Sequence, residues 1–360
     1  MLWTREVNGG KRVWIGLLLS AIFVALFFVT VDFRRLLDAL MGANYVYVIP
    51  GIGLYIIGVW FRTLRWRRLL HHIRPIPTTR LFPVVVVGYM ANNLLPLRLG
   101  ELVRSYYVGD REQVSKAAAL VTIFIERLLD ALMLLLFILV IAIFVPLIGL
   151  AEGFEERFSL PWPLLAGAIS IPFIGAFGLL VVVAYTPAKV RALISLVLRL
   201  MPTAIESRLM HIVDMFLEGL ESLKSPLTIL AVFILSAPVW LFEAGLFLFV
   251  GYSFGFHEIY DNLPELIVVM ILVTAIANIG ASIPAGPGGI GLFEIIARET
   301  LVLLPLATMD RAVAGAYVAV VHACLLIPMI VLGQFFLWTQ HVSLRSLTRL
   351  GQDKDREPDE

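Results

Sequence analysis

Several ionisable side chains lie inside long apolar stretches of this sequence, where an isolated charge is costly and is therefore a candidate for function. Glu126 and Asp130 are four residues apart in TIFIERLLDALMLLL, so they share one face of a helix, and Arg127 lies beside them. Such a group can join neighbouring helices through ion pairs with Arg98 or Arg104. It can equally form a polar wall that guides a lipid head group or a proton, and we leave both interpretations open.

Glu243 and His322 each stand alone in an apolar stretch. A carboxylate at membrane depth needs either a partner or a proton, so Glu243 is a candidate for head-group binding or proton coupling. His322 is either a packing residue with an ordinary hydrogen bond or a proton carrier.

Two further stretches interrupt the apolar pattern with residues that break helices. ANNLLPLRLGELVR (91–104) and ANIGASIPAGPGGIGLFEIIAR (277–298) both run Ala-Asn, then Pro, Gly, Glu and Arg. Backbone broken at membrane depth is tolerated only where protein buries it or where it lines a wet cavity, and in transporters it marks substrate sites. The alternative for the second stretch is a short loop between two ordinary spans. The candidate substrate-binding residues in these stretches are Asn92, Arg98, Glu101, Arg104, Asn278, Pro284, Gly288, Gly289, Glu294 and Arg298.

The arginines beside the breaks indicate the chemistry of the ligand. The guanidinium fork of Arg98, Arg104 or Arg298 matches a phosphate, and free backbone N–H groups at the start of a half-helix add an anion site. The alternative is that each arginine extends its charge to the membrane interface. We interpret the basic cluster at 62–74 as a topology signal that contacts anionic lipids.

Composition places the chain among membrane proteins. Of its 360 residues, 60% are hydrophobic and only 15% are charged, and several runs approach the roughly 20 apolar residues that span a bilayer. The single cysteine, Cys324, excludes an intrachain disulfide. We find no phosphate-binding loop, no metal-ligand spacing, no catalytic constellation and no ring of filter residues. We therefore expect no cofactor, no metal, no nucleic-acid partner, no enzymatic activity and no ion channel.

The distribution of charges predicts the topology. Lys and Arg gather at 62–80, 189–224 and 341–349, which we place in the cytoplasm, whereas the acidic loops at 152–157 and 258–265 are external. Apolar spans are expected at 13–31, 44–61, 117–145, 162–185, 227–250 and 312–338. Parity then requires that 81–108 enters and leaves from the cytoplasm and that 264–304 enters and leaves from outside.

These features predict an all-α polytopic membrane protein with about six full transmembrane helices and two opposed re-entrant hairpins. The first repeat is 1–145, with its re-entrant segment at 81–108. The second, inverted repeat is 146–340, with an amphipathic helix at about 203–224 and a re-entrant segment at 264–304. The helix at 203–224 lies either on the membrane surface or on the protein itself. The polar tail 341–360 and the N-terminus are expected in the cytoplasm, with the chain in the cell (inner) membrane.

The motifs also resemble a known family. FRTLRWRRLL, VGYMANNLLPLRLGELVRSYYV, the following ERLLD and ANIGASIPAGPGGIGLFE look like the lysylphosphatidylglycerol synthase transmembrane-domain family, from about Val13 to Trp338. The resemblance implies a flippase-like domain, which in the best-known members moves aminoacylated phosphatidylglycerol between leaflets. There a separate C-terminal domain makes that lipid from aminoacyl-tRNA. This sequence stops shortly after the last expected span, so we expect no synthase domain and no lipid aminoacylation.

The function we expect is a lipid flippase or transporter for a phospholipid or a polyprenyl-phosphate-linked lipid. Its partners are membrane lipids that are anionic or carry phosphate, and a homo-oligomer is left open. Proton coupling through Glu243, Glu126 or His322 and passive scrambling both remain open. The alternative is a membrane enzyme or accessory subunit in envelope lipid or glycan synthesis.

Overall fold

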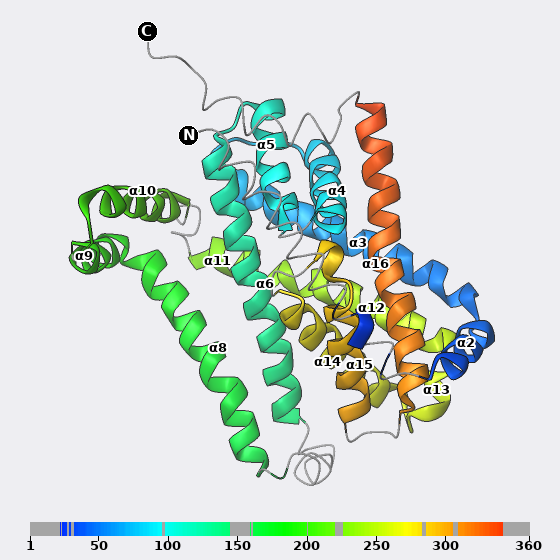
Figure 1. Ribbon diagram of the computed structural model, residues 1–360. Coiled ribbons are helices and arrows are strands. Elements are labelled where there is room, and N and C mark those ends of the chain that lie inside the picture. Colours follow the sequence, from blue (N-terminus) through cyan, green and yellow to red (C-terminus); the bar gives the residue numbers. More distant parts are fainter. Residues whose placement is uncertain are drawn as a thin grey trace.

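The computed structural model describes residues 32–95, 98–144, 161–199, 201–219, 226–282, 286–304 and 309–340, together with residues 22, 24–26, 29 and 159. Within these ranges every regular element is helical (Figure 1). The elements are α2 (Phe33–Gly42), η1 (Tyr45–Tyr47), α3 (Val48–Leu70), α4 (Thr78–Leu94), α5 (Gly100–Glu112), α6 (Lys116–Phe144), α8 (Trp162–Tyr185), α9 (Pro187–Leu198), α10 (Thr203–Gly219), α11 (Pro226–Ile234), α12 (Ser236–Ser253), α13 (Phe256–Ile259), α14 (Leu263–Gly280), η5 (Pro287–Gly289), α15 (Leu292–Leu303) and α16 (Arg311–Thr339).

The length and apolar composition of the helices are those of a polytopic membrane protein. Among the described residues, four helical segments are long and apolar enough to cross a bilayer: Tyr45–Leu70, Leu227–Ser253, Leu263–Gly280 and Arg311–Thr339. The chain is therefore an all-helical polytopic membrane protein, as its composition predicted. Most of the expected span at 13–31, the acidic loop at 152–157, Pro96, Pro284 and the tail 341–360 lie outside the described residues.

Local sequence explains where several helices begin. Asp310 lies just before α16, and its carboxylate accepts hydrogen bonds from the backbone N–H groups of Ala312 and Val313, which have no partner within the helix. Asn262 caps α14 in the same way through the N–H of Glu265, and Pro264 occupies the first turn, where its missing N–H costs nothing.

Among the described helices, α3 and α12 pack on each other most extensively, and they run obliquely behind α4, α6 and α16 (Figure 1). Glycine makes this approach possible. A Cβ atom at Gly58 would lie 3.2 Å from the carbonyl oxygen of Val239 and 3.3 Å from the Cβ of Phe242. Small residues at such crossings let membrane helices approach closely, because association there depends on packing and not on the hydrophobic effect.

Two helical hairpins face each other between α6 and α16. The α4–α5 hairpin occupies the upper half of the molecule and the α14–α15 hairpin the lower half (Figure 1). At 1.5 Å per residue, the 13 residues of α5 and the 12 of α15 extend only about 18 to 20 Å, less than the roughly 30 Å of a hydrocarbon core. Gly100 allows α5 to pack on α4, because a Cβ there would lie 2.1 Å from the carbonyl oxygen of Gly88.

The contacts between helices form matched pairs. α4 packs on α16, and α14 packs on α6. α5 packs on α6, and α15 packs on α16. α3 contacts both α4 and α6, whereas α12 contacts both α14 and α16. The helices correspond in the order α3 with α12, α4 with α14, α5 with α15 and α6 with α16. Exchanging each helix for its counterpart turns every one of these contacts into another contact of the same set.

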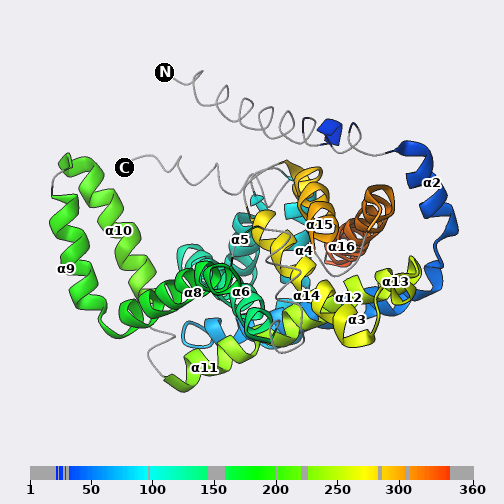
Figure 2. The same ribbon diagram turned by 90° about the horizontal axis from the view of Figure 1, so that it is seen from below.

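A separate arm made of α8, α9 and α10 extends from α6 (Figures 1 and 2). The helix predicted at 203–224 is present from Thr203 to Gly219, and residues 220–224 lie outside the described residues. α10 packs on both α6 and α9. The exposed Arg191 of α9 donates two hydrogen bonds, of 2.6 and 3.1 Å, to the carboxylate of Asp214 on α10, and this partner raises the pKa of the guanidinium above its usual value.

Candidate functional site

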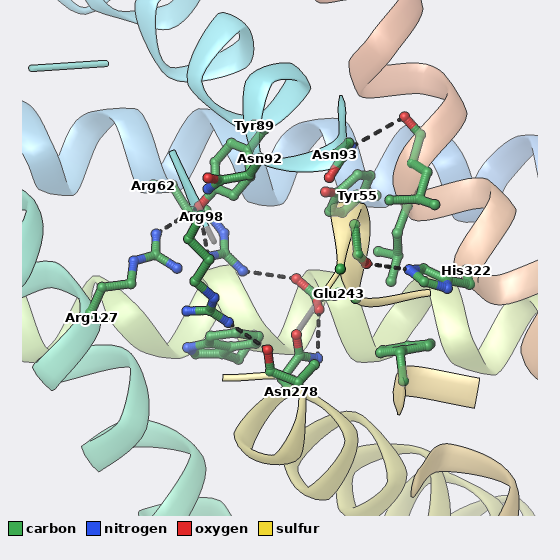
Figure 3. A pocket seen from close by; sticks show the side chains of 18 residues that line it. Tyr55, Arg62, Tyr89, Asn92, Asn93, Arg98, Arg127, Glu243, Asn278 and His322 are labelled. Atoms are coloured by element: carbon green, nitrogen blue, oxygen red, sulfur yellow. Dashed lines mark hydrogen bonds and ion pairs between the residues drawn. The ribbon is translucent and has the colours of Figure 1, made fainter. Parts of the chain in front are cut away.

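A cavity of about 160 Å³ lies where the two hairpin turns meet (Figure 3). This volume is far larger than the roughly 10–15 Å³ that one water molecule requires. In Figure 3 the α4 hairpin approaches the cavity from above and the α14 hairpin from below. The predicted residues that line it are Asn92, Arg98, Arg127, Glu243, Asn278, Gly288, Gly289 and His322, and they are joined by Tyr55, Arg62, Tyr89, Asn93, Trp240, Ala281, Gly286, Phe293, Leu325 and Leu326.

Glu243 is not the isolated carboxylate that its surroundings in the sequence suggested. Its Oε2 atom accepts a hydrogen bond of 2.8 Å from Arg62 Nη2, and its Oε1 atom accepts one of 2.8 Å from Asn278 Nδ2. Hydrogen bonds that involve ionised groups are roughly twice as strong as neutral ones. Glu243 therefore ties α12 to α3 and α14 at the wall of the cavity.

Tyr89 connects two of the guanidinium groups. Its hydroxyl oxygen accepts hydrogen bonds of 3.0 Å from both Arg62 Nη1 and Arg127 Nη2. The Arg62 guanidinium also lies 4.4 Å from the ring centroid of Trp240, a cation–π contact. These contacts fix two positive groups from α3 and α6 on the same side of the cavity.

Arg98 bridges the two hairpin turns. Its backbone has a φ of 55°, in the left-handed region that few non-glycine residues adopt. Its Nη2 atom donates a hydrogen bond of 2.8 Å to the carbonyl oxygen of Ala281, just after the end of α14. Within the described ranges Arg98 forms no salt bridge, whereas Arg62 and Arg127 at the same cavity each pair with carboxylates.

A buried ion network lies behind this wall. Arg65 Nη1 is 2.7 Å from Asp130 Oδ1, and Arg65 Nη2 is 3.6 Å from Glu126 Oε1. Arg104 Nη2 is 2.7 Å from Glu126 Oε2, which confirms that an ion pair joins the first hairpin to α6. Arg127 lies 3.5 Å from Asp130 and 3.6 Å from Glu101. This network holds α3, α5 and α6 together beside the cavity.

The interpretation of the basic cluster at 62–74 was wrong for its first members. α3 continues to Leu70, nine residues beyond the predicted end at residue 61, and buries Arg62 and Arg65 with 5% and 0% of their surface exposed. Both lie on the face of α3 that meets the carboxylates of α6 and α12. The sequence did hold a signal for the burial of these arginines. The apolar stretches contain more carboxylates than basic residues, so some carboxylates need a basic partner from outside those stretches.

His322 also has partners. Its Nδ1 atom lies 2.6 Å from Glu294 Oε1, and its Nε2 atom lies 3.0 Å from the carbonyl oxygen of Gly288. Glu294 Oε2 accepts a hydrogen bond of 2.7 Å from the backbone N–H of Gly291. α16, α15 and the glycine turn are thus joined through one histidine and one glutamate.

Other predicted residues lie away from the cavity. Arg298 is buried on α15, where its Nη2 atom is 2.8 Å from Glu299 Oε1, and it does not line the cavity. Pro284 lies outside the described residues. In the part of the chain that the structure describes, no three His, Cys, Asp or Glu side chains are grouped so that they could hold a metal ion.

The helical fold and the charged cavity between two hairpins define a class of polytopic membrane protein with a polar centre. Residues 13–333 match the family model of the lysylphosphatidylglycerol synthase TM region, and the chain belongs to this family. The family resemblance of the sequence motifs is thereby confirmed.

Relatives in archaea align with parts of the chain. A UPF0104 membrane protein of Methanocaldococcus jannaschii is 30% identical over 173 residues, which are 46% of this chain and 50% of that protein. A UPF0104 membrane protein of Methanothermobacter thermautotrophicus is 35% identical over 96 residues, 26% of this chain and 28% of the relative. Glycosyltransferase AglD of Haloferax volcanii is 22% identical over 371 aligned positions, 96% of this chain and 58% of that protein. The chain therefore spans about half or less of the first two relatives and somewhat more than half of the third.

Proposed function

We propose that this protein is a lipid flippase or transporter that passes a phosphate-bearing head group through the cavity while the lipid tails stay in the bilayer. The observation that carries the proposal is the charge of the cavity wall. Among its described lining residues, Arg62, Arg98 and Arg127 are accompanied by a single carboxylate, Glu243. Arg62 is neutralised by Glu243, and Arg127 by the acids behind the wall, whereas Arg98 is left to attract an anion. Guanidinium forks suit phosphate oxygens in particular.

We infer further that the two halves, 1–145 and 146–340, are inverted repeats with six spans and two re-entrant hairpins. The exchange relation among the helix contacts supports this plan, as does the shortness of α5 and α15. Asn92 and Asn278 hold corresponding places before the two breaks, and both line the cavity. Inverted repeats let one half rock against the other around a central site, which opens it to each side of the membrane in turn.

Labelling of single cysteines will test the topology. In a Cys324→Ala background, cysteines at Thr79 and Asp110 mark the two ends of the α4–α5 hairpin, and cysteines at Asp261 and Asp310 mark those of the α14–α15 hairpin. All four positions are exposed. A membrane-impermeant maleimide should label the first pair only from the cytoplasm and the second pair only from outside. Labelling of all four from one side would refute the inverted repeat.

Lipid movement is tested in proteoliposomes with fluorescent NBD-phosphatidylglycerol and dithionite, which bleaches only the outer leaflet. Without protein about half of the fluorescence stays protected, since spontaneous flipping of a charged head group across hydrocarbon is slow. With the reconstituted protein most of it should become accessible. NBD-glucosylceramide has a polar head group without phosphate and should move far less. If neither lipid responds to the protein, the flippase proposal fails.

We propose that the protein moves its lipid without converting it chemically. We also propose that both termini lie in the cytoplasm and that the partners are anionic lipids of the cell membrane.

One observation favours the alternative that the protein is an enzyme: the relative named glycosyltransferase AglD aligns with 96% of this chain. Incubation of the purified protein with a radiolabelled polyprenyl-phosphate sugar and acceptor lipid separates the two functions. Formation of a glycosylated product would establish an enzyme, and movement of the lipid without product would establish a transporter.

A further inference from the structure

The pair His322–Glu294 holds the glycine turn of the second hairpin at two points, and a third contact joins the two side chains. His322 Nε2 contacts the carbonyl oxygen of Gly288, His322 Nδ1 contacts Glu294 Oε1, and Glu294 Oε2 accepts from the N–H of Gly291. The His322 side chain is 5% exposed and that of Glu294 is 14% exposed. The histidine also lines the cavity (Figure 3).

The partners of the two ring nitrogens determine how many protons the pair needs for both contacts to be hydrogen bonds. A neutral imidazole has one N–H group and one acceptor nitrogen. Both ring nitrogens of His322 face oxygen atoms that are acceptors, namely a carbonyl and a carboxylate. Both contacts become hydrogen bonds only if the pair holds an additional proton, as imidazolium with carboxylate or as neutral imidazole with carboxylic acid. Each arrangement is neutral overall, which suits a buried position.

The turn itself depends on these contacts. Gly288, Gly289 and Gly291 have φ values of 63°, 72° and 90°, which glycine adopts without strain but which it also leaves easily. Gly288 lies against the first hairpin, since a Cβ there would be 3.5 Å from the carbonyl oxygen of Asn93. A movement of the glycine turn would therefore alter the contact between the two hairpins at Gly288 and Asn93.

Several of the other charged groups around the pair form ion pairs or hydrogen bonds with one another. The titratable or charged groups that line the same cavity are Tyr55, Arg62, Tyr89, Arg98, Arg127 and Glu243. On α15, Arg298 pairs with Glu299, and α2 contributes Arg35, which pairs with Asp310 at the start of α16. Glu243 is bonded to Arg62 and Asn278. Glu294 is thus the carboxylate in direct contact with His322.

We propose that His322 and Glu294 form a proton-binding site whose proton couples lipid movement to the proton gradient; this coupling rests on the proposed flippase function. With the additional proton bound, both contacts of His322 are hydrogen bonds and the glycine turn is held on α16. Release of that proton to water leaves an imidazole with one N–H, so one of the two bonds is lost and the turn is free to move away from the first hairpin.

Hydrogen–deuterium exchange of the turn across a pH series tests the site in the full-length protein in nanodiscs. The closed turn holds one proton that the open turn has released to water. Over the pH range in which this difference exists, rising pH favours the open turn. After correction for intrinsic exchange, protection of the peptide that contains Gly291 should then fall about tenfold per pH unit. Protection that does not change with pH in the wild type would overturn the proposal.

The variant Glu294→Gln should fold and keep the closed turn, because its amide has the hydrogen-bond donor and acceptor of a protonated carboxyl group. It can donate to His322 Nδ1 and accept from the N–H of Gly291. We expect high protection at every pH in this variant, and low protection at every pH in His322→Gln. Glu299→Gln on the same helix is the matched control and should keep the wild-type dependence. A Glu294→Gln variant that still responds to pH as the wild type does would also refute the proton site.

Failure of the proton site and failure of the flippase proposal can be told apart. If exchange follows pH as expected but NBD-phosphatidylglycerol does not move, the proton site stands and the flippase proposal falls. If the lipid moves but the protection of the turn from exchange does not change with pH, the proton site is refuted and the protein transports lipid without this proton.

Discussion

Replacement of Arg98 by alanine is expected to slow the movement of NBD-phosphatidylglycerol by roughly 10- to 100-fold. A hydrogen bond to a charged group contributes about 1.5–3 kcal/mol, and each 1.4 kcal/mol corresponds to a factor of ten. Arg98 lines the cavity and forms its side-chain hydrogen bond with the backbone carbonyl of Ala281. Its loss therefore removes the positive charge that is most available to a phosphate. The measurement is the dithionite assay in proteoliposomes at matched protein content.

Two further substitutions separate charge from geometry. Arg98→Lys keeps the charge but loses the planar fork, so we expect an intermediate rate. Arg98→Gly removes the side chain and also relieves the backbone at φ 55°, so this variant should be as slow as Arg98→Ala but more stable to heat. Arg68→Ala, exposed on α3, is the matched control and should keep the wild-type rate. Wild-type flipping by Arg98→Ala would show that the head group takes another path.

Features that depend on neighbouring residues could be predicted from the sequence. Proline and glycine within 91–104 and 277–298 disfavour a continuous helix, so residue type alone predicted the two interruptions, and the structure ends α4 at Leu94 and α14 at Gly280. The contact between Arg104 and Glu126 was also within reach, because the two residues flank one short connection in the same half of the chain.

Pairings across the two halves were not predictable in the same way. Glu243 and Arg62 are 181 residues apart, and Glu243 stands alone in its own apolar stretch until α3 packs on α12. Hydropathy ended the second span at residue 61 because an arginine is counted as costly wherever it lies. Burial with a carboxylate partner reverses that expectation, and a single sequence does not say which carboxylate the partner is. The partners of His322 were missed for a similar reason, since Glu294 lies on another helix.

Replacement of Arg65 by alanine is expected to lower the free energy of unfolding by about 3–5 kcal/mol, the largest stability effect that we predict. Arg65 has no exposed surface and contacts both Asp130 and Glu126. Its removal leaves two buried carboxylates with fewer partners, and the cost of an unpaired buried charge exceeds the value of the pair itself. Unfolding by SDS in mixed micelles, followed by tryptophan fluorescence, measures the change.

Arg67→Ala is the matched control for this prediction, because Arg67 is exposed two residues further along α3 and its loss should change stability by no more than about 0.5 kcal/mol. The double variant Arg65→Gln/Asp130→Asn replaces one charge of each sign, so it should be less destabilised than the sum of its single variants. Equal stability of Arg65→Ala and Arg67→Ala would mean that the network does not hold α3 to α6. The cavity wall formed by Arg62 and Arg127 would then need another support, because both side chains also contact Asp130 of this network.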